Sequence, residues 1–150
     1  MCGVMVREYR STILAGSRLV SGELSAKWKT FLGITTGASG CPFPQSAGVS
    51  SAASVQNGVV YVGSFDNNLY AFNATTGAKL WSAATGGGIG SSPAVANSVV
   101  YVGSVDKNLY AFNATTGAKL WSVTTGGAIL SSPSVANGVV YIGSADNNLY

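Results

Sequence analysis

Three aspartates recur at a fixed interval of 40 residues, at Asp66, Asp106 and Asp146. Carboxylate oxygens are the ligands that calcium prefers in proteins, so these side chains are candidates for a cation site or for another loop-face binding site. Aspartate is also an ordinary turn residue, because its side chain bonds the backbone two residues further on. Each aspartate stands in a turn-like run such as Asp66-Asn67-Asn68. We expect the turn role to outweigh the ligand role.

Catalytic chemistry finds little support in the rest of the sequence. There is no histidine, which removes the commonest general base and transition-metal ligand. The abundant serines therefore cannot form a Ser-His-Asp arrangement. The run Gly86–Ser92 is rich in glycine, but a phosphate loop must open a helix, and none is expected there. We predict no catalytic and no metal-binding residue. A non-enzymatic function is therefore favoured over an enzymatic one.

Two further features leave alternatives open. Asn73-Ala74-Thr75 and Asn113-Ala114-Thr115 fit the glycosylation sequon, although a structural role for both asparagines is favoured. Cys2 and Cys41 lie outside the repeated part of the chain. Either a disulfide or two unrelated thiols is compatible with this pair.

Composition excludes several classes of protein. Hydrophobic residues make up 47% of the 150 residues and charged residues 9%, which is too apolar for a disordered chain. No apolar run reaches the roughly 18 residues of a membrane span. The net charge is +3, but five of the eight cations lie within the first 29 residues, so the repeats are neutral. A nucleic-acid partner, which needs clustered cations, is therefore not expected.

The composition also bears on location. Serine, threonine, asparagine and glycine must form most of the surface, as is common in exported β proteins. We therefore expect an exported, periplasmic or cell-surface protein. Residues 1–10 do not form a signal peptide, because their apolar stretch is short and is interrupted by Arg7 and Glu8.

The elements that carry the aspartates are set by an internal repeat. The run A-F-N-A-T-T-G-A-K-L-W occupies Ala71–Trp81 and again Ala111–Trp121. Residues 51–90 and 91–130 differ at only eleven positions, and a third copy runs from Ser131 to Tyr150. A period of 20–50 residues signals a solenoid, a propeller or an array of repeats.

Each unit is predicted to form four short strands. Asn57-Gly58 and Asn137-Gly138 are typical of two-residue hairpin turns, and V-V-Y-V-G-S is rich in strand-forming residues. No helical period extends over ten residues. We therefore predict an all-β fold, a partial β-propeller of four-stranded antiparallel blades with a 40-residue repeat.

The predicted divisions follow from this period. Residues 51–90 and 91–130 form one blade each, and 131–150 form an incomplete blade. Residues 1–32 form a degenerate blade or an irregular segment, in which Ser11–Ser17 echoes the second strand at Gly58–Ser64. Residues 33–48, with two prolines and four glycines, form a loop insertion. The turns between second and third strands, the blade-to-blade links and this insertion are expected on one face.

The eleven-residue run resembles the tryptophan-docking motif of the pyrroloquinoline-quinone-type (PQQ-type) propeller repeat. The matching positions are Ala71, Asn73, Thr76, Gly77 and Trp81, with Ala111, Asn113, Thr116, Gly117 and Trp121 in the next unit. The resemblance implies that each tryptophan packs on the glycine of an adjoining blade and that its indole N–H bonds the main chain near the motif alanine. Ala71, Gly77, Trp81, Ala111, Gly117 and Trp121 are the predicted docking residues, and Trp28 is a candidate third tryptophan.

The resemblance leaves two functions open. The favoured one is a non-catalytic propeller module without a cofactor, a scaffold or binding surface for a protein partner, as a fragment of a longer exported or envelope protein. The alternative is a fragment of a PQQ-dependent dehydrogenase, for which the resemblance implies PQQ and calcium as cofactors. Open blade edges also favour self-association, in which the strand around Trp28 completes the blade at 131–150 of a neighbour.

Overall fold

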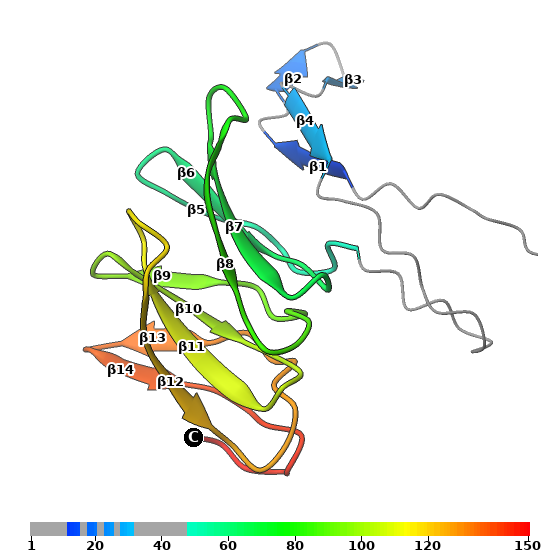
Figure 1. Ribbon diagram of the computed structural model, residues 1–150. Helices are drawn as coiled ribbons and strands as arrows, with labels where there is room; N and C mark the ends of the chain where they lie inside the picture. Colours follow the sequence, from blue (N-terminus) through cyan, green and yellow to red (C-terminus); the bar gives the residue numbers. More distant parts are fainter. Residues whose placement is uncertain (1–11, 16–17, 21–22, 26–27, 32–47) are drawn as a thin grey trace, which may run out of the picture.

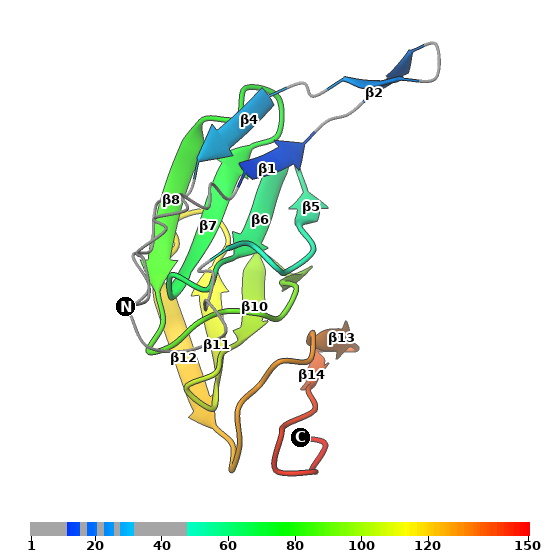
Figure 2. The same cartoon turned by 90° about the vertical axis from the view of Figure 1, so that its right-hand side faces the viewer.

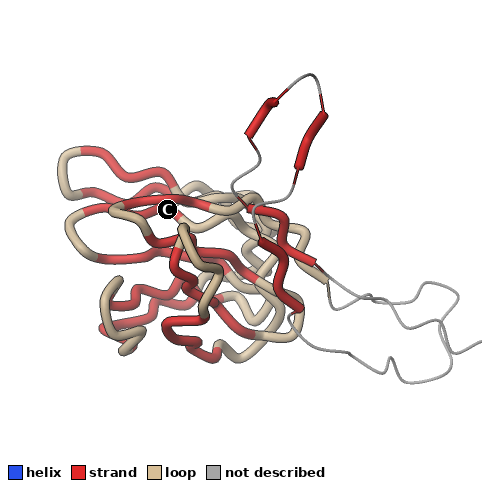
Figure 3. Tube along the Cα trace, turned by 90° about the horizontal axis from the view of Figure 1, so that it is seen from above, coloured by secondary structure: helices blue, strands red, loops and turns tan. Residues whose placement is uncertain are grey.

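The computed structural model describes residues 12–15, 18–20, 23–25, 28–31 and 48–150. Residues 33–47 of the insertion predicted at 33–48, and both cysteines, lie outside these ranges. All regular elements in the described ranges are strands, as Figures 1 and 3 show. The prediction of an all-β fold is therefore confirmed.

Two complete four-stranded antiparallel sheets form the middle of the molecule, and each arises from one 40-residue unit (Figure 1). The first blade contains β5 (Ser54–Gln56), β6 (Val59–Gly63), β7 (Asn68–Asn73) and β8 (Lys79–Ala84), in that order. The second blade contains β9 (Ala94–Ala96), β10 (Val99–Gly103), β11 (Asn108–Asn113) and β12 (Lys119–Thr124). The first strands β5 and β13 both contact β9, so these strands form the inner edge of the row.

The third unit forms only the inner half of a blade. Strands β13 (Ser134–Ala136) and β14 (Val139–Tyr141) pair, and a bridge between Gly143 and Leu149 begins a third strand. The same contact joins Gly63 to Leu69 in the first blade. Residues 131–150 therefore follow the path of the earlier units as far as the sequence extends.

Two antiparallel strand pairs precede the first blade. Strand β1 (Thr12–Ala15) pairs with β4 (Trp28–Phe31), and between them in the chain β2 (Arg18–Val20) pairs with β3 (Glu23–Ser25). Ala15 lies opposite Trp28, in the register that joins Ala71 to Trp81. In this register β1 takes the place of a third strand. The sequence echo had placed Ser11–Ser17 as a second strand, and the difference arises because a short V/I/L-rich run has no register of its own.

The hairpin turns have the backbone that the sequence predicts. Asn57 and Gly58 have φ values of 51° and 75°, and Asn137 and Gly138 have 51° and 78°. Both central residues of such a turn need positive φ, which asparagine and glycine accept. The second blade has Asn97 and Ser98 in the same turn, at 50° and 61°, although serine is not a preferred residue there.

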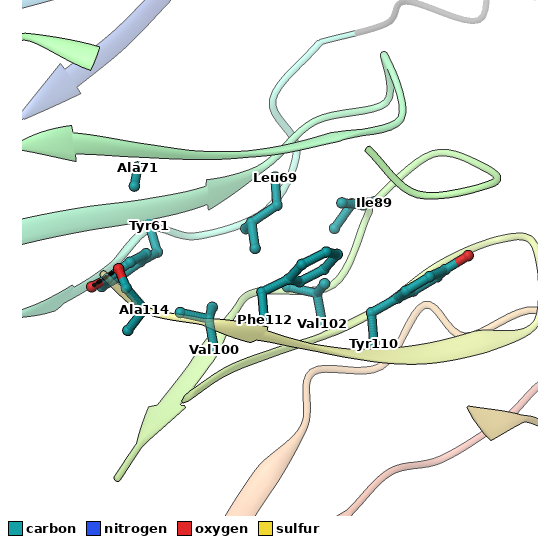
Figure 4. Packing of buried hydrophobic residues seen from close by; sticks show 9 residues of the cluster. All are labelled: Tyr61, Leu69, Ala71, Ile89, Val100, Val102, Tyr110, Phe112 and Ala114. Carbon is teal, nitrogen blue, oxygen red and sulfur yellow. Dashed lines mark hydrogen bonds between the residues drawn. The ribbon is translucent and has the colours of Figure 1, made fainter. Parts of the chain in front are cut away.

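The main core lies between the two complete blades (Figure 4). Leu69 and Ala71 from β7 face Val100 and Val102 from β10, and all four are fully buried. Ile89, in the link between the blades, packs against Gly63, where any side chain would collide with it. Blade packing therefore depends on large apolar residues that meet small ones across the interface.

Candidate functional site: the docking tryptophans and the turn face

Trp81 joins the first blade to the second. Its indole Nε1–H donates a hydrogen bond to the carbonyl oxygen of Ala114 over 3.0 Å. A Cβ added to Gly117 would lie 2.7 Å from Cε3 of Trp81, so the ring covers the glycine backbone directly. Gly117 has a φ of 74°, which favours glycine in any case. The Tyr61 ring lies 5.8 Å from the Trp81 ring, and its hydroxyl donates to the same carbonyl.

Trp28 makes the same arrangement one unit earlier. Its Nε1–H donates to the carbonyl of Ala74 over 3.0 Å, and its Cδ2 lies 2.6 Å from the Cβ position of Gly77. The Phe72 ring lies 6.1 Å from the indole. Strand β4 therefore contacts the first blade in the way that β8 contacts the second.

Trp121 has a different environment. It is 39% exposed, and the Tyr101 ring lies 5.8 Å from it at an angle of 48°. The positions that would repeat Ala114 and Gly117 lie 40 residues further on, beyond Tyr150. Trp121 thus keeps the contact with its own blade, while the face that Trp81 presents to the next blade is open to solvent.

The structure identifies the main-chain acceptor that was expected near the motif alanine. Ala71 and Ala111 are fully buried, and each lies opposite the tryptophan of its own blade in the strand register. The indoles of Trp28 and Trp81 donate to the carbonyls of Ala74 and Ala114, three residues further along the motif. Sequence reasoning did not single out these residues, because a backbone acceptor leaves no trace in the side chain.

The three aspartates each hold a turn between second and third strands. Oδ1 of Asp66 accepts from the backbone N–H of Asn68 over 3.0 Å, and its Oδ2 accepts from the Tyr70 hydroxyl over 2.8 Å. Asp106 repeats both bonds with Asn108 and Tyr110, and Asp146 with Asn148 and Tyr150. The bonds explain why the residue four positions after each aspartate is a tyrosine, a signal that the sequence analysis did not use.

These contacts shift the ionisation of the turn groups. Burial favours the neutral form of Asp106, but bonds from Tyr110, Asn108 and Ser104 outweigh it and lower the pKa. Desolvation also opposes ionisation of Asp146, yet bonds from Tyr150, Asn148, Gly126 and Ser144 lower its pKa to about 2. Burial, followed by the bond to Asp66, raises the pKa of Tyr70 to about 12. Both aspartates are therefore held as carboxylates.

The turns and the links between blades meet on one face, as the strand order predicts. The N–H of Thr85 donates to the carbonyl of Asn67, and the N–H of Val105 donates to the carbonyl of Gly88. In the next unit, the N–H of Gly126 donates to Oδ2 of Asp146 over 2.6 Å. This turn face consists of the turns 64–68, 104–108 and 144–148 together with the links that follow the two complete blades.

Other candidates have structural roles or lie outside the described ranges. Asn73 Oδ1 accepts from the N–H groups of Thr75 and Thr76, so the asparagine of this sequon caps a turn. A strand, β9, follows Gly86–Ser92 where a phosphate loop would need a helix. Among the described residues, no cluster of three or more His, Cys, Asp or Glu side chains could hold a metal ion. In the same part of the chain, no helix is long and apolar enough to cross a membrane.

Four-stranded blades joined through tryptophan, glycine and a backbone carbonyl define a propeller repeat protein. A family model described as "Outer membrane protein assembly factor BamB", of the PQQ repeat type, matches residues 25–150. The chain belongs to this family, and the resemblance to the PQQ-type repeat is confirmed. Among curated protein sequences, none matches significantly.

Solved structures share the fold. BamB from Moraxella catarrhalis is 15% identical with a TM-score of 0.65, and the match covers 96% of this chain and 47% of BamB. The quinohemoprotein alcohol dehydrogenase ADHIIG from Pseudomonas putida HK5 is 30% identical with a TM-score of 0.60, over 66% of this chain and 17% of the dehydrogenase. The computationally designed Ika4 protein is 16% identical with a TM-score of 0.60, over 86% and 71% of the two chains. The chain therefore spans less than half of either natural protein.

Proposed function

We propose that this chain is a non-catalytic propeller module that serves as a scaffold or binding surface within a longer exported or envelope protein. The observation that carries the proposal is the use of the turn carboxylates. Asp66, Asp106 and Asp146 each spend one oxygen on a backbone N–H and the other on a tyrosine hydroxyl. These are the only acidic residues of 51–150, and their bonds stabilise turns.

The tips of those turns support a binding role. Asn67, Lys107 and Asn147 occupy the tips, are exposed, and have φ values of 71°, 74° and 70°. The units are otherwise nearly identical, yet this position changes from asparagine to lysine. A rigid turn that presents a variable exposed residue is typical of a scaffold whose loops bind partners.

A protein partner and an envelope location are supported by the family. The matching model is described as an outer membrane protein assembly factor. The substrates of such an assembly factor would contain strands in which apolar and polar residues alternate, as in outer-membrane barrels. We propose that the turn face binds a segment of this kind.

Calorimetric titration tests the proposal with two probes. One probe is a set of peptides of about ten residues with alternating apolar and polar side chains, the pattern of an outer-membrane strand. The other is PQQ with calcium. We expect the peptides to bind and the quinone not to bind. The variant Lys107→Asn, which copies the other two units, should change peptide binding without changing stability.

The alternative function has one observation in its favour. The match to the alcohol dehydrogenase reaches 30% identity, twice that to BamB, although it covers only 17% of the enzyme. If this chain belonged to such an enzyme, PQQ and calcium would bind and would support dye reduction with an alcohol. That result, together with loss of calcium binding in Asp106→Asn, would overturn the scaffold proposal.

A further inference from the structure

The differences between the first two units are concentrated at the turn face. Residues 68–82 and 108–122, which form the third strand, the docking motif and most of the fourth strand, are identical. Outside 51–58 and 91–98, the units differ only in the second-to-third turn, at the end of the fourth strand and in the link: Phe65/Val105, Asn67/Lys107, Ala83/Val123, Ala84/Thr124, Gly88/Ala128 and Gly90/Leu130. The blade is thus constant where the loops vary, as expected of a surface that binds a partner.

Apolar side chains from three segments meet at the first link, which Figure 2 shows as the loop that runs from the end of β8 to β9. A Cβ added to Gly90 would lie 3.0 Å from Cζ of Phe65 and 3.4 Å from Cδ2 of Leu130. A Cβ added to Gly87 would lie 2.9 Å from Cγ2 of Val105. The three side chains therefore lie against a link whose glycines add no side chains of their own. Phe65, Val105 and Leu130 are called the apolar patch below.

The apolar patch is partly open to solvent. Val105 is 37% exposed, although the units before and after it are both described. Phe65 and Gly90 are half-buried. Aromatic rings are enriched at protein interfaces, and a few large residues at the centre supply most of the binding energy. The patch therefore has the composition of a docking point for an apolar side chain.

The second link does not repeat the apolar patch. Ala128 and Leu130 occupy the positions of two glycines of the first link. The turns before and after the second link carry Val105 and Ala145, so neither turn supplies an aromatic ring. The two links therefore offer a partner different surfaces, although the blades that they join are nearly identical.

Lys107 is the only cation of the turn face and follows Val105 by two residues in the same turn. Its N–H donates to the Ser104 carbonyl over 3.2 Å. Its own carbonyl accepts from the N–H of Thr125 over 2.8 Å and from the Thr125 hydroxyl over 3.0 Å. These bonds fix the main chain of Lys107, while its side chain is exposed. The carboxylate oxygens of the same turn already bond a backbone N–H and a tyrosine hydroxyl.

We propose that the apolar patch binds an apolar side chain of an extended protein segment and that Lys107 pairs with an acidic side chain of the same segment. The inference rests on the proposed function, in which the turn face binds a segment of alternating apolar and polar residues, and it adds that acidic residues occupy the polar positions. Opposite charge favours such a partner, whereas a lysine-rich segment would bring like charges together. The tips at Asn67 and Asn147 are neutral, so the single cation also sets the direction in which the segment lies.

Calorimetric titration of the 150-residue chain with three peptides tests the charge preference. The peptides have about ten residues with the same alternating apolar side chains, and glutamate, glutamine or lysine fills their polar positions. We expect the glutamate peptide to bind about threefold more tightly than the glutamine peptide, as for one exposed ion pair, and the lysine peptide to bind most weakly. Lys107→Asn, which copies the other two tips, should remove this preference, and added salt should reduce it.

Substitutions in the apolar patch test the docking point. Phe65→Val, which copies the second unit, should weaken binding of the glutamate and glutamine peptides about tenfold or more, because it truncates a large interface residue. Val105→Ala copies the third unit at an exposed position and should weaken binding less. Val55→Ala is the matched control: Val55 is 65% exposed but lies in β5, outside the turn face, so its truncation should leave the affinities unchanged.

The outcomes separate this inference from the proposed function. If none of the peptides bound, the proposed function of the turn face would be overturned, and this inference with it. If the three peptides bound equally, or if the preference for glutamate survived Lys107→Asn, the charge pairing would be wrong while the proposed function stood. If Phe65→Val and Val105→Ala changed binding no more than Val55→Ala, the apolar patch would be ruled out as the docking point.

Discussion

The tryptophan of the docking motif has different surroundings in the first and second blades. Between the first and second blades, Trp81 lies on Gly117 and bonds the Ala114 carbonyl. One unit later, Trp121 keeps its tyrosine neighbour but is 39% exposed, because the described structure offers no blade in front of it. The motif therefore supplies only one side of a joint, and the stability it contributes depends on the unit that follows.

The largest contrast is expected from the two tryptophans. Trp81→Ala should lower the free energy of unfolding by about 3–5 kcal/mol, as for other buried aromatic truncations. Trp121→Ala should lower it by about 1 kcal/mol or less, as at other partly exposed positions. Urea unfolding of the two variants measures both losses. Equal losses of unfolding free energy would show that Trp81 gains no extra stability from its contact with the next blade.

The glycines give the next contrast. Gly117→Ala places a methyl group 2.7 Å from Trp81 at a φ of 74°, and we expect a loss of about 2–4 kcal/mol. Gly138 has a φ of 78° with no atom within 4 Å of its Cβ position, so Gly138→Ala measures the backbone cost alone, about 1 kcal/mol. Thermal unfolding of both variants provides the comparison. If Gly138→Ala lowered stability as much as Gly117→Ala, contact with the Trp81 indole would not explain the cost at Gly117.

A smaller contrast concerns the serines that begin each unit. Ser91 is fully buried and both donates to the Gly103 carbonyl and accepts from its N–H, over 2.9 and 2.8 Å. Ser131 makes the same pair with Gly143 but is exposed. We expect Ser91→Ala to cost about 1–3 kcal/mol, because buried groups are left unsatisfied, and Ser131→Ala about 0.5 kcal/mol or less. Chemical unfolding of the two alanine variants decides the point.

The smallest effect is expected from protonation at the open end. The pKa of Asp146 is lowered from 3.8 to about 2, so its ionised form favours the folded state above pH 3.8. That contribution is lost as the pH falls from 3.8 towards 2. Tyr150→Phe removes one of the bonds that lower the pKa and should move it back towards 3.8. Carboxyl chemical shifts followed through an acid titration would show this, and an unchanged value would remove the tyrosine from the explanation.

Sequence reasoning gave the architecture because the information is local and repeated. The 40-residue period, the Asn-Gly turns and the motif tryptophans predicted strand number and order correctly. It did not predict that Ala74 and Ala114 supply the acceptors, since the bond is to a carbonyl, nor that β1 takes a third-strand place. It also did not pair Asp66 with Tyr70, although the two recur together, because the link between them is made only by the turn geometry.

The Ala114 carbonyl accepts from two donors at once, the Tyr61 hydroxyl at 3.2 Å and the Trp81 indole at 3.0 Å. Both donors belong to the preceding blade, so the stretching frequency of the Ala114 carbonyl depends on contact with that blade. An isotope label at this single carbonyl would give an infrared band that moves to higher frequency when the neighbouring sheet swings away. The infrared band of the Ala114 carbonyl would therefore report the separation of one blade from the next.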